Sequence, residues 1–288
     1  MVKTIGDELL KIGLVQAKVS QDIDSNLDKT AKFISKAASK GAEIVCLQEL
    51  FATQYFAQAE NRKFFELAEK IPNKTSKFLS GQAKSNKITL VGGSIYEKDG
   101  KKLFNTSLIF DKTGKTICKY RKVHIPYDPM YYEQFYFAPG NLGFRQVQVP
   151  KLKIAPLICY DQWYPEAARI NALKGAGLIF YPTAIGWAGD MKKHEPFSAQ
   201  RWQDAMKSHA SMNGIYVAAA NRVGKEGKMN FWGGSFIADP FGQVVAKASD
   251  SKEEVLVADI DLEKISMSKE GWRFLQNRQV KDYKDLVK

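Results

Sequence analysis

Short apolar runs rich in valine, isoleucine and leucine alternate along the chain with stretches of helical periodicity, and this alternation limits the possible folds most strongly. Several runs are almost continuously apolar, as in strands that are buried on both faces. Amphipathic helices are predicted over 22–40, 165–174 and 198–212. The predicted strands are 11–17, 42–49, 88–97, 105–111, 152–159, 177–183, 214–221, 234–240 and 254–261. The pattern predicts an α/β protein with two stacked sheets covered on the outside by helices.

Two segments of the chain resemble each other. Residues 38–49 (ASKGAEIVCLQE) and 172–183 (ALKGAGLIFYPT) share the pattern Ala-x-Lys-Gly-Ala followed by an apolar run. In each, we expect a helix to end at the lysine and the glycine to turn the chain into the next strand. A true repeat would give two similar halves with Glu49 and Thr183 at related strand ends, but chance is an equal alternative. No low-complexity linker divides residues 1–288, so we expect a single domain.

The formal net charge of +12 raises the question of an anionic partner. The basic residues are dispersed, with no basic run of five and no aromatic-interleaved motif, so we expect no binding to nucleic acid. No apolar stretch is long enough to span a bilayer or to act as a signal peptide, so we expect no membrane partner. Three cysteines form neither a CxxC pair nor an even disulfide framework, which favours a reducing cytoplasm.

Four reactive side chains lie just after apolar runs or beside turns, which is where α/β folds place their sites: Glu49, Lys122, Glu133 and Cys159. A cysteine becomes a nucleophile when a neighbouring base takes its proton. A carboxylate can be that base, and a lysine can stabilise the oxyanion that forms at an attacked carbonyl. Glutamate, lysine and cysteine together therefore suffice for acyl transfer without a metal or other cofactor.

Structural roles compete with this interpretation. Cys46 lies in the middle of an apolar run, and Cys118 is also expected to be structural. His124 and His209 lack the spacing of metal ligands, so we expect no metal site. From spacing alone, Cys159 is equally well explained as a buried core residue or as a nucleophile.

The order of three motifs resembles the nitrilase superfamily of carbon–nitrogen hydrolases. They are QELF (48–51), YRKVHIP (120–126) and ICYDQWYPE (158–166), and the similarity extends over about residues 11–262. The resemblance implies an α-β-β-α sandwich, with residues 263–288 as a C-terminal tail. Because family members often use such tails between subunits, it also implies a homodimer or a higher homo-oligomer.

The resemblance also implies a role for each reactive residue. Glu49 is expected to be the general base, Lys122 the stabiliser of the oxyanion, and Cys159 the nucleophile. Glu133 corresponds to a second glutamate that many members hold near the lysine and the cysteine. The backbone amide of Tyr160 is expected to be the other oxyanion donor.

Within the superfamily, the segments LQELFATQYFAQAE (47–60) and CYDQWYPEAAR (159–169) resemble the N-carbamoylputrescine amidohydrolase branch. This branch hydrolyses N-carbamoylputrescine to putrescine, ammonia and carbon dioxide in polyamine biosynthesis, without a cofactor. The alternatives are a superfamily amidohydrolase for N-carbamoyl-β-alanine, N-carbamoyl amino acids or ω-amides. A basic, non-catalytic binding protein is a remote alternative, in which Cys159 would lie far from Glu49 and Lys122.

A small cationic ureido substrate requires local negative charge, because a chain of net charge +12 repels it. The candidate carboxylates are Asp128, Asp190 and Glu195. The closest family pattern has an acidic residue directly after PTAIG, whereas this chain continues with Trp187. We expect Trp187 to stack on the substrate, with packing inside the protein as an equal alternative.

Overall fold

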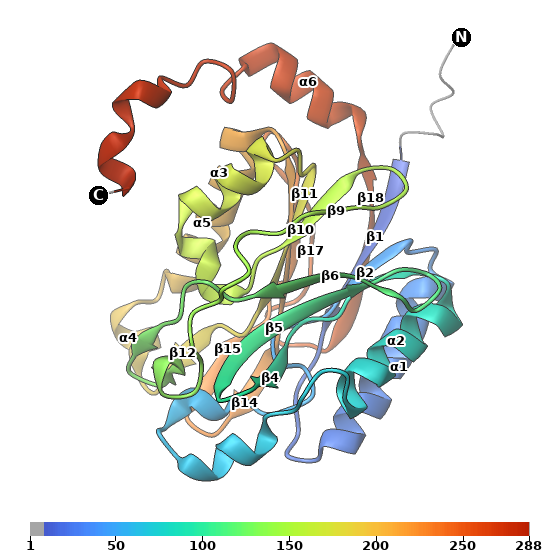
Figure 1. Cartoon of the computed structure of the whole chain (residues 1–288), viewed down its shortest axis with the longest axis vertical. Helices are drawn as coiled ribbons and strands as arrows, with labels where there is room; N and C mark the ends of the chain where they lie inside the picture. Colours follow the sequence, from blue (N-terminus) through green and yellow to red (C-terminus); the bar gives the residue numbers. More distant parts are fainter. Residues whose placement is uncertain (1–8, 288) are drawn as a thin grey trace.

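A computed structural model describes residues 9–287. Residues 1–8, which belong to the N-terminal segment expected to lack a signal peptide, and residue 288 lie outside the described residues. Two large mixed sheets stack face to face in the described part, with helices covering their outer faces (Figure 1). The predicted α-β-β-α sandwich is therefore confirmed. No described helix is both long enough and apolar enough to cross a membrane.

The first large sheet carries helices α1 (Ile23–Ser39) and α2 (Lys74–Asn86) on its outer face. Its strands β1, β2 and β3 run parallel, and the others are antiparallel to their neighbours. The order is β18 (Glu254–Asp261), β1 (Leu9–Gln16), β2 (Ile44–Cys46), β3 (Thr89–Val91), β5 (Lys102–Phe110) and β4 (Ile95–Asp99), with β6 (Thr116–Arg121) also pairing with β5.

The second large sheet carries α3 (Pro165–Leu173) and α5 (Ser198–Asn213) on its outer face. Its order is β17 (Val244–Lys247), β16 (Phe236–Ala238), β13 (Tyr216–Asn221), β11 (Leu178–Thr183), β10 (Lys153–Pro156) and β9 (Val147–Gln148). Two small sheets consist of β12 (Gly186–Ala188), β15 (Met229–Trp232) and β14 (Val223–Glu226), and of β7 (Tyr127–Asp128) and β8 (Tyr131–Tyr132). The remaining elements are α4 (Met191–His194), α6 (Glu263–Trp272) and 3₁₀ helices at Phe56–Gln58, Arg62–Leu67, Glu133–Phe135, Cys159–Trp163, Val280–Asp282 and Lys284–Val287.

Alternation along the strands builds three core layers. In β11, Leu178 and Phe180 enter the layer between the sheets, while Ile179 and Tyr181 face α3 and α5. Because successive strand side chains point to opposite faces, a strand with both faces covered must be apolar throughout. This explains why several predicted strands have continuous apolar runs.

The helices begin where local side chains satisfy their free N–H groups. The Asp22 carboxylate accepts a hydrogen bond from the Ser25 N–H at the start of α1, and Pro165 occupies the first turn of α3. The predicted amphipathic helix over 22–40 is present as α1. Its residues Leu27 and Ile34 are buried against the sheet, and Ala31 is half-buried.

The resemblance between the two sequence segments reflects a structural repeat. Lys40 and Lys174 end α1 and α3 as expected, and Gly41 and Gly175 follow with φ angles of 88° and 92°. The units β1-α1-β2-α2-β3 and β10-α3-β11-α5-β13 each place three parallel strands side by side in chain order. Both segments therefore lie at the same junction, where the first helix of such a unit leads into its second strand.

Several predicted strands are shorter than the apolar runs indicated. The run 88–97 forms two strands, β3 and β4, because Gly92 and Gly93 break it. A Cβ at Gly93, which has a φ of +60°, would lie 2.1 Å from the Gln48 carbonyl oxygen. The strands β2 and β10 end at Cys46 and Pro156, so the candidate catalytic residues that follow them lie in turns.

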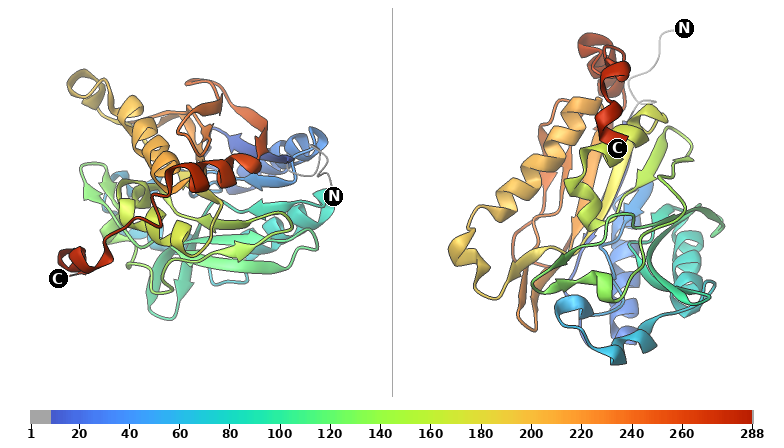
Figure 2. Two further views of the ribbon diagram at one scale, coloured as in Figure 1. Left: turned by 90° about the horizontal axis from the view of Figure 1, so that it is seen from above. Right: turned by 60° about the vertical axis from the view of Figure 1, so that its left-hand side comes forward.

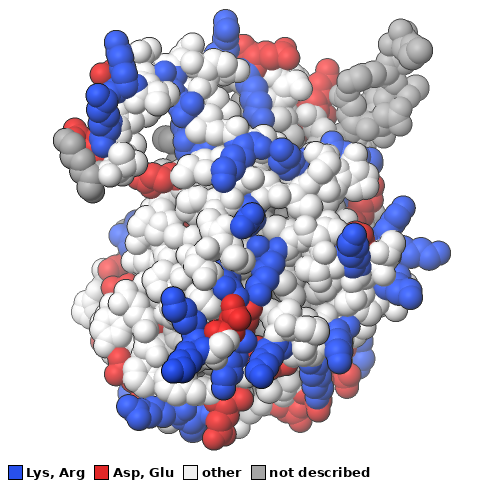
Figure 3. Space-filling view, viewed as in Figure 1, with Lys and Arg blue, Asp and Glu red and all other residues white. Residues whose placement is uncertain are grey.

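The C-terminal tail extends across the end of the sandwich in both views of Figure 2, and its last part projects away from the sandwich in the left view. Trp272, Phe274 and Leu286 expose large apolar side chains there. In Figure 3, lysine and arginine side chains are spread over the whole visible face, with acidic groups among them in both its upper and lower parts. The positive charge on this face is therefore dispersed, as the sequence indicated.

The close approach at Gly93 predicts a large effect of a single methyl group. Gly93→Ala should lower the free energy of unfolding by about 2 kcal/mol or more, because the Cβ collides with backbone and the φ is positive. Gly81→Ala is the matched control, since a Cβ there meets nothing within 4 Å on the exposed face of α2. It should raise stability by about 0.5–1 kcal/mol. Urea unfolding measures both changes, and equal stability of the two variants would contradict this account.

Candidate active site

Lys122 lies between two buried carboxylates. It follows β6 directly, and its Nζ donates to Glu49 Oε1 at 2.9 Å and to Glu133 Oε2 at 2.7 Å. The side chains of all three residues are fully buried. An ammonium and two carboxylates without water require close mutual pairing, so the three groups form one rigid cluster.

The remaining carboxylate oxygens differ in their partners. Glu49 Oε1 also accepts from Asn105 Nδ2 at 2.8 Å, and Glu133 Oε1 accepts from the Tyr55 hydroxyl at 2.8 Å. Glu49 Oε2 is buried and has no hydrogen-bond partner among the described residues. This oxygen is the free proton acceptor of the cluster.

Cys159 occupies a strained turn after β10. Its φ is +44°, in the left-handed region that side chains other than glycine rarely adopt. The buried Asp161 carboxylate holds this turn, accepting from the Ile158 N–H at 2.9 Å and from the Tyr120 hydroxyl at 2.7 Å. It also accepts from the His124 N–H at 3.1 Å. Asp161 therefore has a structural role, because it holds the turn that carries Cys159.

Glu49 lies in a second strained turn, after β2. The side chain of Gln48 pairs with the end of β1, accepting from the Ala17 N–H at 2.8 Å and donating to the Ala17 carbonyl at 3.0 Å. Leu50, the next residue after Glu49, has a φ of +46°. Side-chain hydrogen bonds thus take over where the backbone ladder ends, and they direct Glu49 inward.

Burial and mutual charge set the ionisation of the cluster. Burial tends to lower the pKa of Lys122, but the carboxylates of Glu133 and Glu49 outweigh it and raise that pKa above its ordinary value. Burial raises the pKa of Glu133 to about 7, against the opposing effect of Lys122. Burial also raises the pKa of the Cys159 thiol, and Glu49 raises it further. The resting site therefore holds a neutral thiol, a charged ammonium and a carboxylate that can take the thiol proton.

A cavity of about 480 Å³ opens above the cluster. Cys159 and Glu133 form part of its wall, and the Tyr160 side chain lines it. The Tyr160 amide begins the 3₁₀ helix at Cys159, where the first N–H groups have no helical partner. This position suits a donor toward a reacting carbonyl beside Cys159.

The three carboxylates proposed for a cationic substrate all line this cavity: Asp128, Asp190 and Glu195. Glu195 Oε2 pairs with Arg201 at 3.1 Å, and Asp190 lies 3.7 Å from His194. Asp128 makes no side-chain hydrogen bond or ion pair with another described residue and stands exposed on β7. Charged groups of both signs thus surround the cavity, with acid in excess.

Trp187 does not line the cavity, contrary to the expected stacking on a substrate. Its neighbours Gly186 and Ala188 do, because alternation along β12 turns the tryptophan to the opposite face. There its ring packs edge-on against Trp232 at 4.9 Å between centroids, and Lys192 Nζ lies 4.5 Å from its centre. The cation on this ring is the protein's own.

The sequence interpretation missed three residues of the site. Tyr55 and Asn105 bind the two carboxylates of the cluster, and Arg201 lines the cavity. Asn105 begins the polar run Asn-Thr-Ser inside the buried strand β5, and a polar run in a buried strand is a signal that could have identified it. No comparable local signal marks Tyr55 or Arg201.

The arrangement fits nucleophilic attack on a carbonyl. A thiol, a carboxylate acceptor and an ammonium are held together, and the cavity admits a small molecule to the thiol. The ammonium can stabilise a developing oxyanion without moving, because the two glutamates already fix it.

The family model for carbon–nitrogen hydrolases matches residues 11–270. The chain therefore belongs to the carbon–nitrogen hydrolase family, which is part of the nitrilase superfamily. The family expected from three short motifs is confirmed.

Relatives with different substrates share this similarity. An N-carbamoylputrescine amidase of Solanum lycopersicum is 36% identical, with 98% of this chain and 96% of the relative covered. A citrullinase of Francisella tularensis is 33% identical, with coverages of 97% and 98%. The crystal structure of a carbon–nitrogen hydrolase from Helicobacter pylori G27 is 38% identical, with a TM-score of 0.91 and coverages of 97% and 99%. The family is thus shared, while the substrates named for these relatives differ.

The raised pKa of Glu133 predicts a pH-dependent contribution to stability. Between the ordinary carboxyl value of 4.5 and about 7, the folded state binds more protons than the unfolded state at this residue. The contribution of Glu133 to folding must therefore fall as the pH rises through this range. We expect the stability of the wild type, relative to Glu133→Gln, to decrease from pH 5 to pH 7.

Urea unfolding at pH 5, 6 and 7 measures this difference. Glu166→Gln, at an exposed position in the first turn of α3, controls for the loss of a carboxylate as such. Parallel stability curves of the wild type and Glu133→Gln over this range would contradict the prediction.

Proposed function

We propose that the protein hydrolyses N-carbamoylputrescine to putrescine, ammonia and carbon dioxide, as a step of polyamine biosynthesis. The observation that carries the proposal is the buried cluster of Glu49, Lys122 and Glu133 beside Cys159, at a cavity whose lining is rich in carboxylates. A catalytic thiol must remain reduced, so a cytoplasmic location accords with this chemistry.

In the proposed first half-reaction, Cys159 Sγ attacks the ureido carbonyl carbon while Glu49 takes the thiol proton. Lys122 and the Tyr160 N–H hold the oxyanion. Glu49 then returns the proton to the departing nitrogen, the C–N bond breaks, and putrescine leaves a carbamoyl thioester on the cysteine.

In the second half-reaction, Glu49 takes a proton from water as the water oxygen attacks the thioester carbon. The C–S bond breaks, and the proton returns to the sulfur to restore the thiol. The released carbamic acid decomposes to ammonia and carbon dioxide. Glu133 fixes the Lys122 ammonium throughout, because its Oε2 accepts from Lys122 Nζ at 2.7 Å.

The charge of the lining favours a cation at the far end of the substrate. Asp128, Asp190 and Glu195 outnumber Arg201, the one basic side chain among the described lining residues, and Glu195 already pairs with that arginine. Of the three carboxylates, Asp128 is the best candidate for the substrate ammonium, because it makes no competing side-chain interaction with a described residue. The similarity to the tomato N-carbamoylputrescine amidase supports the same choice.

Citrulline is the second candidate, and Arg201 favours it. Citrulline combines a ureido group with both an ammonium and a carboxylate, so an arginine among acids could bind both ends. N-carbamoyl-β-alanine and ω-amides carry a carboxylate without an ammonium. These compounds meet an excess of like charge in this cavity, so we expect them to be poor substrates.

Ammonia release tests the proposal. We expect the wild type to prefer N-carbamoylputrescine over citrulline and N-carbamoyl-β-alanine in kcat/KM. Cys159→Ala should release no ammonia above background, and Glu49→Gln should lose turnover by at least about 100-fold while its unfolding curve stays cooperative. Release from none of the three compounds would refute the hydrolase proposal, whereas preference for another compound would refute only the substrate.

Asp128→Asn tests the ammonium site. The exchange keeps the side-chain shape and removes its charge, so KM for N-carbamoylputrescine should rise about five- to tenfold with little change in kcat. Pentylurea, which replaces the ammonium by a methyl group, is the matched control and should react equally well with both forms of the enzyme. An equal effect on the two substrates would show that Asp128 does not bind the ammonium.

We also propose that the C-terminal tail joins two copies of the chain. Trp272, Phe274 and Leu286 expose apolar surface on a segment that projects from the sandwich, and such surface commonly marks an interface (Figure 2). Light scattering should give at least two subunits per particle for the full chain and fewer subunits per particle for residues 1–262. An unchanged number of subunits after truncation would contradict this assignment.

A further inference from the structure

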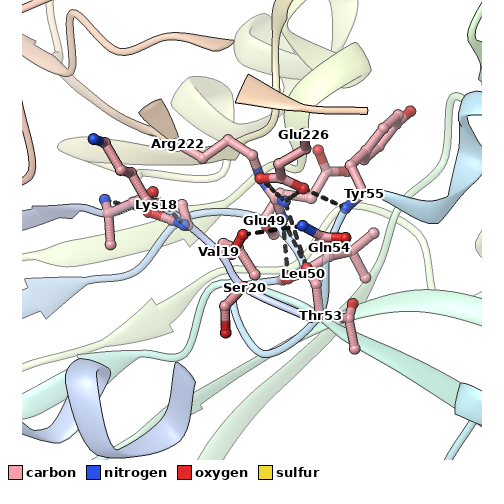
Figure 4. Close-up of polar contacts among 12 residues, drawn as sticks. Lys18, Val19, Ser20, Glu49, Leu50, Thr53, Gln54, Tyr55, Arg222 and Glu226 are labelled. Atoms are coloured by element: carbon pink, nitrogen blue, oxygen red, sulfur yellow. Dashed lines mark hydrogen bonds and ion pairs between the residues drawn. The ribbon is translucent and has the colours of Figure 1, made fainter. Parts of the chain in front are cut away.

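Arg222 is a buried arginine immediately after β13, and it contacts the turn that carries Glu49. Its side chain is completely buried, yet its Nη2 donates to the carbonyl oxygens of Glu49 at 2.7 Å and Leu50 at 3.0 Å. Figure 4 shows the guanidinium directed at this turn, with the Thr53 carbonyl 3.4 Å from it. A guanidinium is a planar fork of donors, so it fixes several acceptors in a defined relative position.

Glu226 pairs with this arginine and reaches the same segment farther along. Its two carboxylate oxygens accept from Arg222 Nη1 at 2.8 and 2.9 Å. Oε2 also accepts from the Tyr55 N–H at 2.7 Å (Figure 4). The ion pair thus binds the Glu49–Tyr55 segment at both ends, through Arg222 at Glu49 and through Glu226 at Tyr55.

Each end of that segment controls one carboxylate of the catalytic cluster. At one end, Glu49 Oε1 accepts from Lys122. At the other, the Tyr55 hydroxyl donates to Glu133 Oε1, and Glu133 binds the same lysine. The distance between the two ends therefore decides how both carboxylates meet one ammonium.

The segment does not hold this shape by its own preference. Leu50 has a φ of +46°, in the left-handed region that is unfavourable for a residue with a side chain. It persists because the Leu50 N–H donates to Ser94 Oγ at 2.9 Å and the Leu50 carbonyl accepts from Arg222. Hydrogen bonds with Ser94 and Arg222 therefore hold the turn in this conformation.

We propose that Arg222 and Glu226 are a positioning pair, which sets the placement of Glu49 and Tyr55 and, through them, of both carboxylates around Lys122. Neither residue touches the substrate in this assignment. The assignment rests on the proposed hydrolysis, because it assumes that the cluster is the catalytic one.

A purely stabilising role explains the pair less well. Removing two charges from water costs several kcal/mol per ion, and apolar residues of similar volume often stabilise a protein equally well. An apolar pair here would leave the Glu49 and Leu50 carbonyls and the Tyr55 N–H without these partners. The pair is better explained as a device that positions the backbone. Its nitrogens and oxygens bind backbone groups that make no hydrogen bonds within a strand.

Glu226→Gln tests the proposal, with Asp239→Asn as matched control. Asp239 is also buried and ion-paired, but its partners are Lys264 and the turn before β17. Both variants replace a buried carboxylate by its amide. We expect Glu226→Gln to lower kcat for N-carbamoylputrescine about 10- to 100-fold per folded molecule, with KM changed by less than about threefold. Asp239→Asn should keep the kcat of the wild type even where its stability falls.

A second measurement does not depend on the substrate. The pH dependence of Cys159 alkylation by iodoacetamide, with Cys159→Ala as background, reports the charges that surround the thiol. Its midpoint should move in Glu226→Gln and stay in place in Asp239→Asn. Arg222→Lys, which keeps the charge without the fork, should lower kcat and move the midpoint in the same way, and it provides the test if Glu226→Gln does not fold.

The outcomes separate the two proposals. If the kcat and the alkylation midpoint of the folded Glu226 or Arg222 variant match those of Asp239→Asn, the pair is only structural and the inference fails. If the wild type releases no ammonia from any ureido compound, the proposed function fails, while the alkylation midpoints still decide the positioning role.

Discussion

The rest of the structure depends on one buried ammonium held between two carboxylates. Each ion taken from water costs several kcal/mol, so Lys122, Glu49 and Glu133 can coexist there only if their hydrogen-bonding groups are closely matched. Asn105 and Tyr55 supply further donors, and one Glu49 oxygen is left open. Removing a single partner exposes an unpaired buried charge, so the cluster tolerates replacement less well than any surface ion pair. The two sheets and their outer helices provide the dry interior in which such a cluster acts at full electrostatic strength.

Each reactive residue has its own buried ionic support at the point where its strand ends. Arg121, next to Lys122, donates from Nε and Nη2 to Glu97 at 2.9 and 2.7 Å. Asp161 holds the strained turn of Cys159, and Arg222 holds that of Glu49. The hydrogen bonds between strands fix the backbone of the sheet, but the reactive residues lie beyond the last residues of the strands. Beyond the strand ends, buried charged side chains therefore hold the backbone in place by ion pairs and hydrogen bonds.

Local sequence pattern could predict the layers and the strand ends, because apolar runs and helix stripes are short-range signals. It could not predict the departures at Leu50 and Cys159, where positive φ angles are imposed by groups distant in the chain. Arg222 is the clearest example, since it binds the Glu49 carbonyl across 173 positions of sequence. An arginine after an apolar strand has the local pattern of a surface charge. The orientation of Trp187 was missed for a related reason, because the pairing of β12 with β15 decides which face it occupies.

A chain of net charge +12 can still bind a cation, because the positive surface charges are farther from the bound cation than the carboxylates of the cavity are. Charges on the surface are screened beyond about 8 Å at physiological ionic strength, so the carboxylates of the cavity dominate at its mouth. The proposed reaction then changes the charge at the ureido end of the substrate, beside Lys122. The ureido group of the substrate is neutral, and it lies beside the Lys122 ammonium without repulsion. Hydrolysis converts it to an amine that takes up a proton at neutral pH, so the product carries a second positive charge close to Lys122. In the proposed mechanism, repulsion from this fixed ammonium favours departure of putrescine over rebinding. The group proposed to stabilise the oxyanion is then also the group that promotes product release.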